Sequence, residues 1–358
     1  QALSATAHGC AMALRAVAPL GAPAAPSSSP TIARPWRAVR RSCQSSAIAA
    51  FALAASSAPK SLRHPGPKHR GRGQATVATR RCAELDAPSY KVVPLEGRGL
   101  GAVATRKLQP GELIITETPV LAYGDDFGPA ELERQFSALD EETRESVLAL
   151  HDSYMLDGEK SLEGIVRTNS YARNSDSADG LLCPRCSRFN HSCSPNCEQS
   201  YNEEASEMRI YASSEIEAGT ELCVFYTEVR QPRAERLQAL QASFGFVCRC
   251  DACSAPSRES DDRRRRLLEI DEQVAAMAAE DPERGIDMMH EMFQLLDKEG
   301  LHLNFVRKRG CFNAYQLSFL CGKKSEATDW VVKAYEFSML SHGPLHPDTV
   351  TLASYVKD

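Results

Sequence analysis

The chain has 358 residues, 42% of them hydrophobic and 25% charged, which suits a globular protein of two or three domains. Its net charge of −5 conceals an asymmetry, because residues 1–83 carry 12 Lys and Arg and no Asp or Glu. Residues 84–358 carry the other 30 basic side chains and all 47 acidic ones. An acidic body argues against a nucleic-acid binder that neutralises phosphates, and the absence of any run of about 18 apolar residues argues against a membrane span.

The N-terminal segment, residues 1–84, is rich in Ala, Ser, Pro and Arg and cannot build a hydrophobic core. Two interpretations stay open. One is a transit peptide, a segment typically rich in Arg and Ser and poor in acids, which would direct the protein to an organelle. The other is a disordered tail or translated upstream sequence, which would leave the protein intracellular, in the nucleus or the cytoplasm. Because the chain begins at Gln1, we expect its N-terminus to be incomplete.

From residue 90 onward, short apolar runs predict strands over 97–121 with a tight turn at Pro110-Gly111. Helical spacing follows over 129–150, where Asp140 is a candidate N-cap. Short β-like pieces are expected over 162–226. One of them begins at Ile216 and repeats the earlier turn sequence around Pro110-Gly111.

From residue 260 the apolar residues follow helical 3-4-3 spacing. Helices are predicted over about 303–321 and 326–341, and helix pairs of this size favour a repeat-like helical region. The run His346-Pro347-Asp348-Thr349 resembles the start of another helix, so we expect the chain to stop within this region.

Three thiols lie close together in Cys248-Arg-Cys250-Asp-Ala-Cys253, and the chain has 13 cysteines, an odd number. A fully disulfide-bonded scaffold is disfavoured, whereas three thiolates at this spacing can surround one zinc ion at about 2.3 Å. Tetrahedral zinc needs a fourth ligand from elsewhere, and the candidates are Cys183, Cys186, Cys193 and Cys197. For the Cys183-Pro-Arg-Cys186 pair itself, coincidence is favoured over half a zinc site or a redox couple, because no βαβ pattern surrounds it.

Three other features could carry chemistry. Gly97-Arg-Gly-Leu-Gly101 precedes strand-like residues, which favours a tight turn, or a close approach to a small ligand, over a phosphate loop. Asn190-His-Ser-Cys-Ser-Pro-Asn196 indicates a polar loop with a candidate metal ligand, and Tyr226 closes an apolar strand. Neither a Gly-x-Ser-x-Gly elbow nor a His-Glu-x-x-His motif occurs, so an acyl hydrolase and a metalloprotease are unsupported.

Taken together, these segments resemble the SET-domain protein-lysine methyltransferases, especially the SET-and-MYND subgroup and its fungal relatives. The family's four signatures occur in order over roughly residues 90–255. They are Gly97-Arg-Gly-Leu with Pro110-Gly-Glu-Leu-Ile, Ser187-Arg-Phe-Asn-His-Ser-Cys-Ser-Pro-Asn196, Ala218-Gly-Thr-Glu-Leu-Cys-Val-Phe-Tyr226, and Phe244-Gly-Phe-Val-Cys-Arg-Cys-Asp-Ala-Cys253.

The resemblance implies a mixed β+α fold, namely a SET β-fold with a pseudoknot and a post-SET zinc site, followed by an all-α helical-repeat-like region. The implied divisions are a SET domain over 85–247 with a helical insert at about 126–160, a post-SET zinc motif over 248–256, and a helical region over 257–358.

The resemblance also implies roles for individual residues, with S-adenosylmethionine and structural Zn²⁺ as cofactors. Cofactor contacts would be made by Gly97, Arg98, Gly99, Asn169, Asn190, His191, Tyr226 and Phe246. The zinc ligands would be Cys193, Cys248, Cys250 and Cys253. Tyr226 would be the catalytic tyrosine, and Tyr171 and Phe244 would line a lysine channel.

These residue types suit methyl transfer to lysine. Transfer of a methyl group from a sulfonium depends on how the two reactants are positioned. The nucleophile must be the neutral amine of lysine, whose ammonium form has an ordinary pKa of about 10.4. An aromatic channel disfavours the ammonium form, and aromatic faces attract the sulfonium. The Tyr226 hydroxyl can orient the amine or the methyl group without acting as a base.

The sequence departs from the family pattern in two places. It has no cysteine between Cys82 and Cys183, so the zinc finger of the SET-and-MYND proteins is absent. Phe244 stands where a tyrosine is common, and losing that hydroxyl leaves more room around the amine. By family analogy, monomethyl-lysine need not be the final product.

An active lysine methyltransferase is the leading hypothesis. The rival hypothesis is a catalytically inactive SET scaffold that binds a protein partner through its helical region. A third hypothesis, a zinc-stabilised helical adaptor, leaves the motifs of residues 97–226 unexplained. The expected partner is a protein substrate with an accessible lysine, which an acidic body would attract if the substrate segment is basic. No direct contact with nucleic acid is expected.

Overall fold

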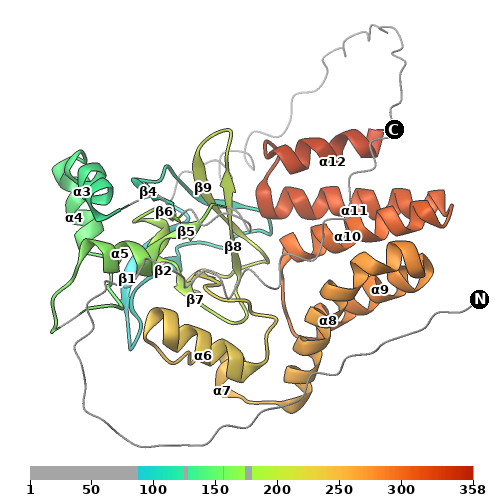
Figure 1. Ribbon diagram of the computed structural model, residues 1–358, viewed down its shortest axis with the longest axis horizontal. Helices are drawn as coiled ribbons and strands as arrows, with labels where there is room; N and C mark the ends of the chain where they lie inside the picture. The colour runs from blue at the N-terminus through green and yellow to red at the C-terminus, as the bar shows by residue number, and fades with distance from the viewer. Residues whose placement is uncertain (1–87, 125–127, 156, 174–179, 358) are drawn as a thin grey trace, which may run out of the picture. The chain divides into compact units, whose positions relative to one another are not determined.

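The computed structural model describes residues 88–124, 128–155, 157–173 and 180–357 (Figure 1). The segment interpreted as a transit peptide or a tail lies outside these residues. Small β-sheets occupy the first part of the described chain, and helices make up the rest. No helix within the described ranges is long and apolar enough to cross a membrane.

A β-hairpin opens the described chain and forms one edge of the site. Strand β1 (Tyr90–Leu95) pairs antiparallel with β2 (Gly99–Ala104). The turn between them needs the left-handed backbone at Gly97 and Gly99, whose φ angles are +67° and +68°. This conformation suits glycine because it has no Cβ. The sequence predicted both a strand after these glycines and a tight turn within them.

Three further small sheets follow within the described residues. One is parallel, β7 (Asn190–His191) with β10 (Cys223–Val224). Two are three-stranded, in the orders β3-β9-β8 and β4-β6-β5. Their strands are β3 (Leu113–Glu117), β4 (Leu121–Tyr123), β5 (Tyr171–Ala172), β6 (Gly180–Leu182), β8 (Cys197–Asn202) and β9 (Glu207–Ala212).

The two similar turn sequences pair with each other. The backbone amide of Leu108 donates to the carbonyl of Ile216 at 2.8 Å, and the reverse bond measures 3.1 Å. The side chains of Leu108 and Ile216 are both buried in the core of the β-rich part. The repeat noted in the sequence is therefore a local contact between distant segments.

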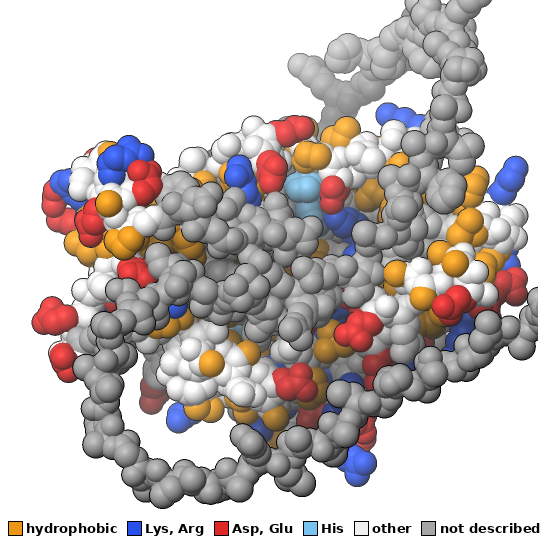
Figure 2. Space-filling view, viewed as in Figure 1, with side chains coloured by type: hydrophobic (Ala, Val, Ile, Leu, Met, Phe, Trp, Pro, Cys, Tyr) orange, Lys and Arg blue, Asp and Glu red, His pale blue; other side chains and the backbone are white. Residues whose placement is uncertain are grey.

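Helices α3 (Pro129–Ser137) and α4 (Glu141–Leu148) lie where helical spacing predicted them. The Asp140 side chain accepts from the amide of Thr143 at 2.8 Å, which is the expected N-cap. Acidic and basic side chains mix over the surface of these two helices (Figure 2).

The prediction of β structure from residue 162 was wrong at its beginning, where α5 (Leu162–Asn169) is a helix. The Ser161 hydroxyl caps it by accepting from the amide of Gly164 at 2.9 Å. Ile165 and Val166 pack into an apolar cluster with residues of α3 and α4. Tertiary packing and the cap outweigh the β-branched character of this short run.

The C-terminal part is helical, as expected. Its helices are α6 (Arg233–Phe244), α7 (Asp251–Ser254), α8 (Arg258–Glu280), α9 (Pro282–Lys298), α10 (Asn304–Leu320), α11 (Lys324–His342) and α12 (Pro347–Lys357), with a 3-10 turn, η1 (Cys186–Arg188), earlier in the chain. From α8 to α12 each helix packs on the next, and Figure 1 shows α9 to α12 stacked side by side. Their shared core is built from Leu, Ile, Val and Met side chains.

The helical part contacts the β-rich part through polar bonds and aromatic rings. At the start of α10, Asn304 donates to the carbonyl of Ser213 at 3.0 Å, and the Phe305 ring stacks on Phe225 at 5.5 Å. At the end of α11, the Tyr211 hydroxyl donates to the carbonyl of His342 at 2.9 Å. These contacts place helical residues along one side of the cavity described next.

Candidate functional site

A cavity of about 1370 Å³ is lined by both parts of the chain. Its wall includes the β1–β2 turn, strand β7 and residues 244–250, and helical residues such as Phe305 complete it. Of the predicted cofactor and channel residues, the cavity is lined by Gly97, Arg98, Gly99, Asn169, Tyr171, Asn190, His191, Tyr226, Phe244 and Phe246. Segments far apart in sequence therefore face one space.

A polar network ties the glycine turn to strand β7. Arg98 donates to the carbonyl of His191 at 2.8 Å and forms an ion pair with Glu221 at 3.2 Å. The Asn190 amide donates to the other oxygen of Glu221 at 2.9 Å. Glu221 thus holds two predicted site residues, a role that sequence reasoning missed. Its place in the third signature, two residues before Cys223 of β10, was the available signal.

Gly101 is also needed here. A Cβ on Gly101 would lie 2.7 Å from the Asn190 amide nitrogen and 3.1 Å from a Glu221 carboxylate oxygen. Both separations are shorter than ordinary van der Waals contact. Only glycine therefore fits at this position without displacing Asn190 or Glu221. The glycine-rich motif predicted a turn, but it did not indicate a separate role for Gly101.

His191 links Tyr226 to the cysteine cluster. Its Nδ1 accepts from the backbone amide of Tyr226 at 3.0 Å, and its Nε2 lies 3.2 Å from the Cys193 sulfur. Burial lowers the pKa of His191 to about 3, so the ring is neutral at pH 7. A neutral ring that accepts at Nδ1 carries its proton on Nε2, directed at Cys193.

The Tyr226 hydroxyl is fixed and protonated. It donates to the carbonyl of Phe189 at 2.8 Å, and burial raises its pKa above the ordinary value. The ring lies 5.0 Å from Phe244 and 5.5 Å from His191, measured between centroids. Such a hydroxyl can accept a hydrogen bond from a group in the cavity but cannot serve as a base at neutral pH.

The aromatic wall continues through Phe246, whose ring lies 6.4 Å from Phe244 and 6.3 Å from His191. Tyr171 is buried and donates its hydroxyl to the carbonyl of Cys186 at 2.7 Å. These residues give the cavity an apolar, π-rich side.

Asn169 stands at the end of α5 and also faces the cavity. Its side-chain amide donates to the carbonyls of His151 and Ile165, both at 2.7 Å. Its donor group is therefore committed to the protein, and its carbonyl oxygen is the atom left for a ligand.

The four predicted zinc ligands come together. The sulfur atoms of Cys193, Cys248, Cys250 and Cys253 are buried and lie within 4.8 Å of one another. Cys193 and Cys253 sulfurs are 3.5 Å apart, close to the separation of two thiolates on one zinc ion. Hydrogen bonds from Cys193 and Cys248 hold the pKa of Cys250 below that of an ordinary thiol. Cys183 and Cys186 are buried elsewhere, in the core of the β-rich part.

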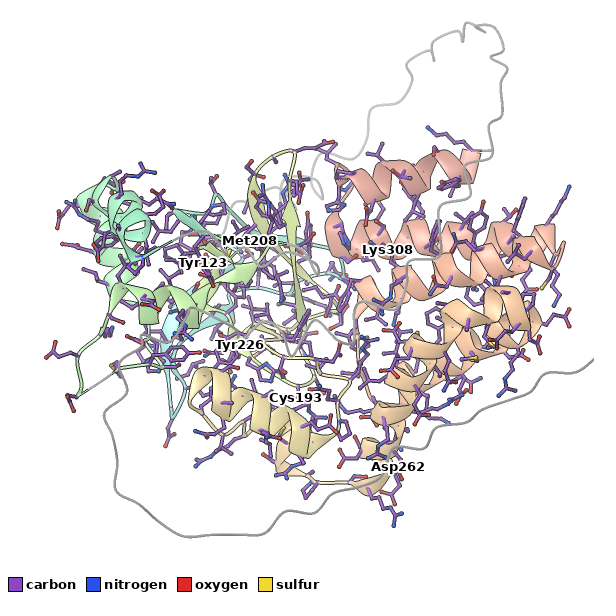
Figure 3. All side chains as sticks on the ribbon, in the orientation of Figure 1. Tyr123, Cys193, Met208, Tyr226, Asp262 and Lys308 are labelled. Atoms are coloured by element: carbon purple, nitrogen blue, oxygen red, sulfur yellow. The ribbon has the colours of Figure 1, made fainter. Side chains whose placement is uncertain are left out.

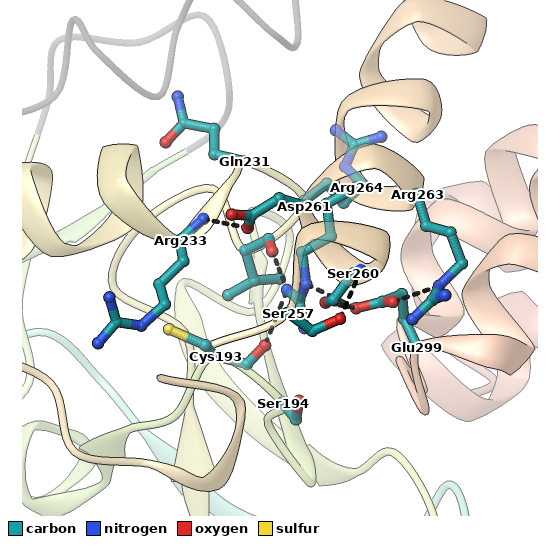
Figure 4. A network of polar contacts seen from close by, with 12 residues as sticks. Cys193, Ser194, Gln231, Arg233, Ser257, Ser260, Asp261, Arg263, Arg264 and Glu299 are labelled. Carbon is teal, nitrogen blue, oxygen red and sulfur yellow. Dashed lines mark hydrogen bonds and ion pairs between the residues drawn. The ribbon is translucent and has the colours of Figure 1, made fainter. Parts of the chain in front are cut away.

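Buried arginines hold the loop that carries Cys193 (Figure 4). Arg264 of α8, 1% exposed, donates to the carbonyls of Cys193, at 3.2 Å, and Val229. Glu299 accepts from Arg264 at 2.8 Å and so neutralises it. Arg236, also 1% exposed, lies 3.9 Å from the Cys253 sulfur. Positive charge beside the sulfurs favours thiolates, the form that binds metal.

The arrangement combines a cavity with one charged end, an aromatic side and a fixed neutral hydroxyl. The cysteine cluster packs against Phe244 and Phe246, and Figure 3 labels Cys193 close to Tyr226. Such a site can bind a cation-bearing ligand against aromatic faces and can orient a neutral nucleophile.

Comparison with known proteins agrees with this geometry. Residues 99–227 match the SET domain family model. The chain is 27% identical over 275 residues to "Histone-lysine N-methyltransferase set5" of Schizosaccharomyces pombe, an alignment that covers 75% of this chain and 84% of that protein.

Shorter alignments connect the chain to other relatives. Identity to mouse "Histone-lysine N-methyltransferase SMYD3" is 34% over 93 residues, 26% of this chain and 20% of that protein. Identity to chicken "N-lysine methyltransferase SMYD2" is 28% over 165 residues, 42% of this chain and 37% of that protein. The chain thus aligns with only about a fifth to two fifths of these two proteins.

Among solved structures, "Crystal structure of the SET domain of LSMT bound to Lysine and AdoHcy" matches with a TM-score of 0.32 and 11% identity, over 76% of this chain and 95% of that one. A likeness this distant identifies neither a fold nor a function. Residues 99–227 therefore match the SET domain family model, and the chain is similar to SET5 and SMYD lysine methyltransferases.

Proposed function

We propose that this chain is an S-adenosylmethionine-dependent protein-lysine N-methyltransferase. One observation carries the proposal: Asn190, His191 and Tyr226 meet on strands β7 and β10 and their adjoining residues, in the wall of one cavity. The proposed divisions are those expected above, a SET domain over 85–247, a post-SET motif over 248–256 and a helical region over 257–358.

The residues present fit the cofactor. S-Adenosylmethionine combines a zwitterionic amino-acid part, a sulfonium and an adenine, and it supplies the methyl group that is transferred. The guanidinium of Arg98 is about one third exposed and is balanced by Glu221, so the pair can receive the amino-acid part. Phe246 provides a partly buried aromatic face for the adenine.

The cysteine cluster fits a structural zinc ion. Four buried thiols beside the charged guanidinium of Arg236 provide the four ligands that a closed zinc site needs. The ion would tie residues 248–253 to Cys193 and so hold Phe244 and Phe246 against the cavity. We assign the loop containing Asn190 to Asn196 to the pseudoknot, since it contributes both a cavity residue and a thiol.

Tyr226 and its aromatic neighbours would act on the lysine. Removing the side chain from water disfavours the ammonium form, so its pKa falls toward neutrality. The Tyr226 hydroxyl donates to Phe189 and keeps its lone pairs for an N–H of the neutral amine. An amine held in this way would turn its lone pair away from Tyr226, and positioning of this kind lowers the barrier to methyl transfer. With Phe244 in place of a tyrosine, the amine has room for more than one methyl group.

The substrate class is a protein with an accessible lysine. The similar set5 protein is named a histone-lysine N-methyltransferase, so a histone tail is the first substrate to test. The helical region stays a predicted binding surface for a further protein partner.

The test uses the full chain purified with zinc, methyl-labelled S-adenosylmethionine and a protein extract supplemented with histones. We expect label on discrete proteins with the wild type and at least a hundredfold less with Tyr226→Phe. Tyr355→Phe is the matched control, because Tyr355 lies on α12, is 42% exposed and does not line the cavity. It should label as the wild type does.

The rival scaffold hypothesis makes the opposite prediction. A folded protein that binds S-adenosylmethionine but labels nothing would support an inactive scaffold. Failure to bind the cofactor at all would overturn the assignments of Asn169, Asn190 and His191 together.

A further inference from the structure

A second group of candidate metal ligands lies at the helical side of the cavity. It comprises His342 at the end of α11, His346 between α11 and α12, and Asp348 in the first turn of α12. One ligand atom from each lies within 4.8 Å of the others, and the two imidazole rings are 4.5 Å apart between centroids. All three residues line the cavity.

The surroundings of His342 leave one ring nitrogen available. The Ser341 hydroxyl donates to the carbonyl of Phe337 at 2.9 Å, so its oxygen is left to accept from Nδ1 of His342. The proton then resides on Nδ1, and Nε2 keeps its lone pair. A hydrogen bond of this kind to the non-ligating nitrogen is the usual support of a metal-bound histidine.

His346 differs from His342, because its Nδ1 already accepts a hydrogen bond. The donor is the backbone amide of Asp348, at 3.2 Å, which is the long end of the hydrogen-bond range. A metal ion at Nδ1 would replace this weak bond, while the other ring nitrogen keeps the proton that it shares with the backbone of Tyr201.

A cation already sits at this position. The ammonium of Lys308, which Figure 3 labels, lies 2.5 Å from the Asp348 carboxylate. The carboxylate is 52% exposed, so ions can reach it from solvent. Lys308 belongs to α10, and its flexible side chain can withdraw when another cation binds.

We propose that His342, His346 and Asp348 form a second metal site that takes a divalent transition metal such as Zn²⁺. Two imidazoles and one carboxylate are a ligand set for zinc and its first-row neighbours rather than for magnesium or calcium. Three protein ligands leave further coordination positions open, as in exchangeable rather than structural sites. The proposal does not depend on methyl transfer.

The experiment measures zinc bound per chain by elemental analysis after loading the full-length protein with Zn²⁺ and removing free metal. We expect the His342→Ala/His346→Ala double variant to bind one zinc fewer than the wild type. Asp348→Asn, a change at a half-exposed position, should weaken this zinc at least tenfold. His302→Ala is the control, because His302 is exposed and lies outside the cluster. It should bind as much zinc as the wild type.

Two further measurements keep the test decisive. Lys308→Ala removes the competing ammonium and should tighten the second zinc by about tenfold. Cobalt substitution should show intense thiolate charge-transfer bands that Cys193→Ser weakens and the histidine variants leave unchanged. Equal zinc content in the wild type and in a folded double variant, or weaker zinc binding in Lys308→Ala, would overturn the proposal. Tyr226→Phe should leave zinc content unaltered, which separates this site from the proposed activity.

Discussion

Replacing Gly101 by alanine would press a methyl group against the network that orients Asn190. The added Cβ would lie 2.3 Å from Leu95 Cδ1, 2.7 Å from Asn190 Nδ2 and 3.1 Å from Glu221 Oε1. Leu95 can rotate away, because only the end of a half-buried side chain is involved. Asn190 cannot, because Glu221 and the carbonyl of Leu100 hold its amide at 2.9 and 3.3 Å.

The expected size of the effect follows from that geometry. Asn190 must retreat by close to 1 Å to reach ordinary contact, and overpacking of this kind costs about 1–3 kcal/mol. The backbone at Gly101 is not in the left-handed region, so contact rather than strain causes the loss. If Asn190 binds S-adenosylmethionine, a displacement worth about 1.4–2.8 kcal/mol weakens binding ten- to a hundredfold.

Gly180→Ala is the matched control for this variant. Its Cβ would lie 2.2 Å from the Tyr123 ring, and Gly180 does not line the cavity. Calorimetric titration and thermal unfolding of both variants separate stability from binding. We expect both to unfold at lower temperature and only Gly101→Ala to bind the cofactor more weakly. Wild-type affinity in Gly101→Ala would refute the reasoning.

Other changes test the cysteine cluster, the buried ions and the interface between the two parts. Cys193→Ser should remove one zinc and lower the unfolding free energy by more than about 4 kcal/mol, so an unchanged melting temperature would contradict the zinc assignment. Arg230 is fully buried between Glu228 and Asp271, so Arg230→Met should cost about 3–5 kcal/mol in urea unfolding, whereas Arg258→Met at a 92%-exposed side chain should cost less than about 0.5 kcal/mol. Burial raises the pKa of Glu198 to about 8, so the native state holds this proton more tightly than the unfolded state. This contribution to stability is complete below about pH 4.5 and is lost as pH rises to 8, by up to about 1.4 kcal/mol per unit. Glu198→Gln lacks this titration, so the difference between the wild-type and variant unfolding free energies should change with pH between about 4.5 and 8. Parallel curves would show that Glu198 is already ionised in the folded chain.

Much of the site was predictable because its residues cluster in short motifs. The three thiols of residues 248–253 indicated zinc by spacing alone. The fourth ligand, Cys193, is 60 residues from Cys253, and only the family resemblance distinguished it from the other cysteines. In the structure its sulfur lies beside the other three, a contact that sequence spacing cannot predict.

The features that sequence reasoning missed depend on contacts between distant segments. Helix α5 was expected to be extended, because its short apolar run has no periodicity long enough to identify it without its packing partners. In the sequence, Glu221 is one polar residue beside a short strand. Its role becomes visible only in its ion pair with Arg98 and its hydrogen bond from Asn190. His346 and Asp348 indicated only a helix start, and His342 comes near them through the turn at Gly343.

The sharpest test of the proposed activity is to identify the product on the substrate itself. Mass spectrometry of proteins treated with the full chain and S-adenosylmethionine should find methyl groups on specific lysine side chains, with dimethyl-lysine present because Phe244 leaves room. Treatment with Tyr226→Phe should leave those lysines unmodified. Unmodified lysines after treatment with a zinc-loaded, cofactor-binding wild type would contradict the assignment of this cavity to lysine methylation.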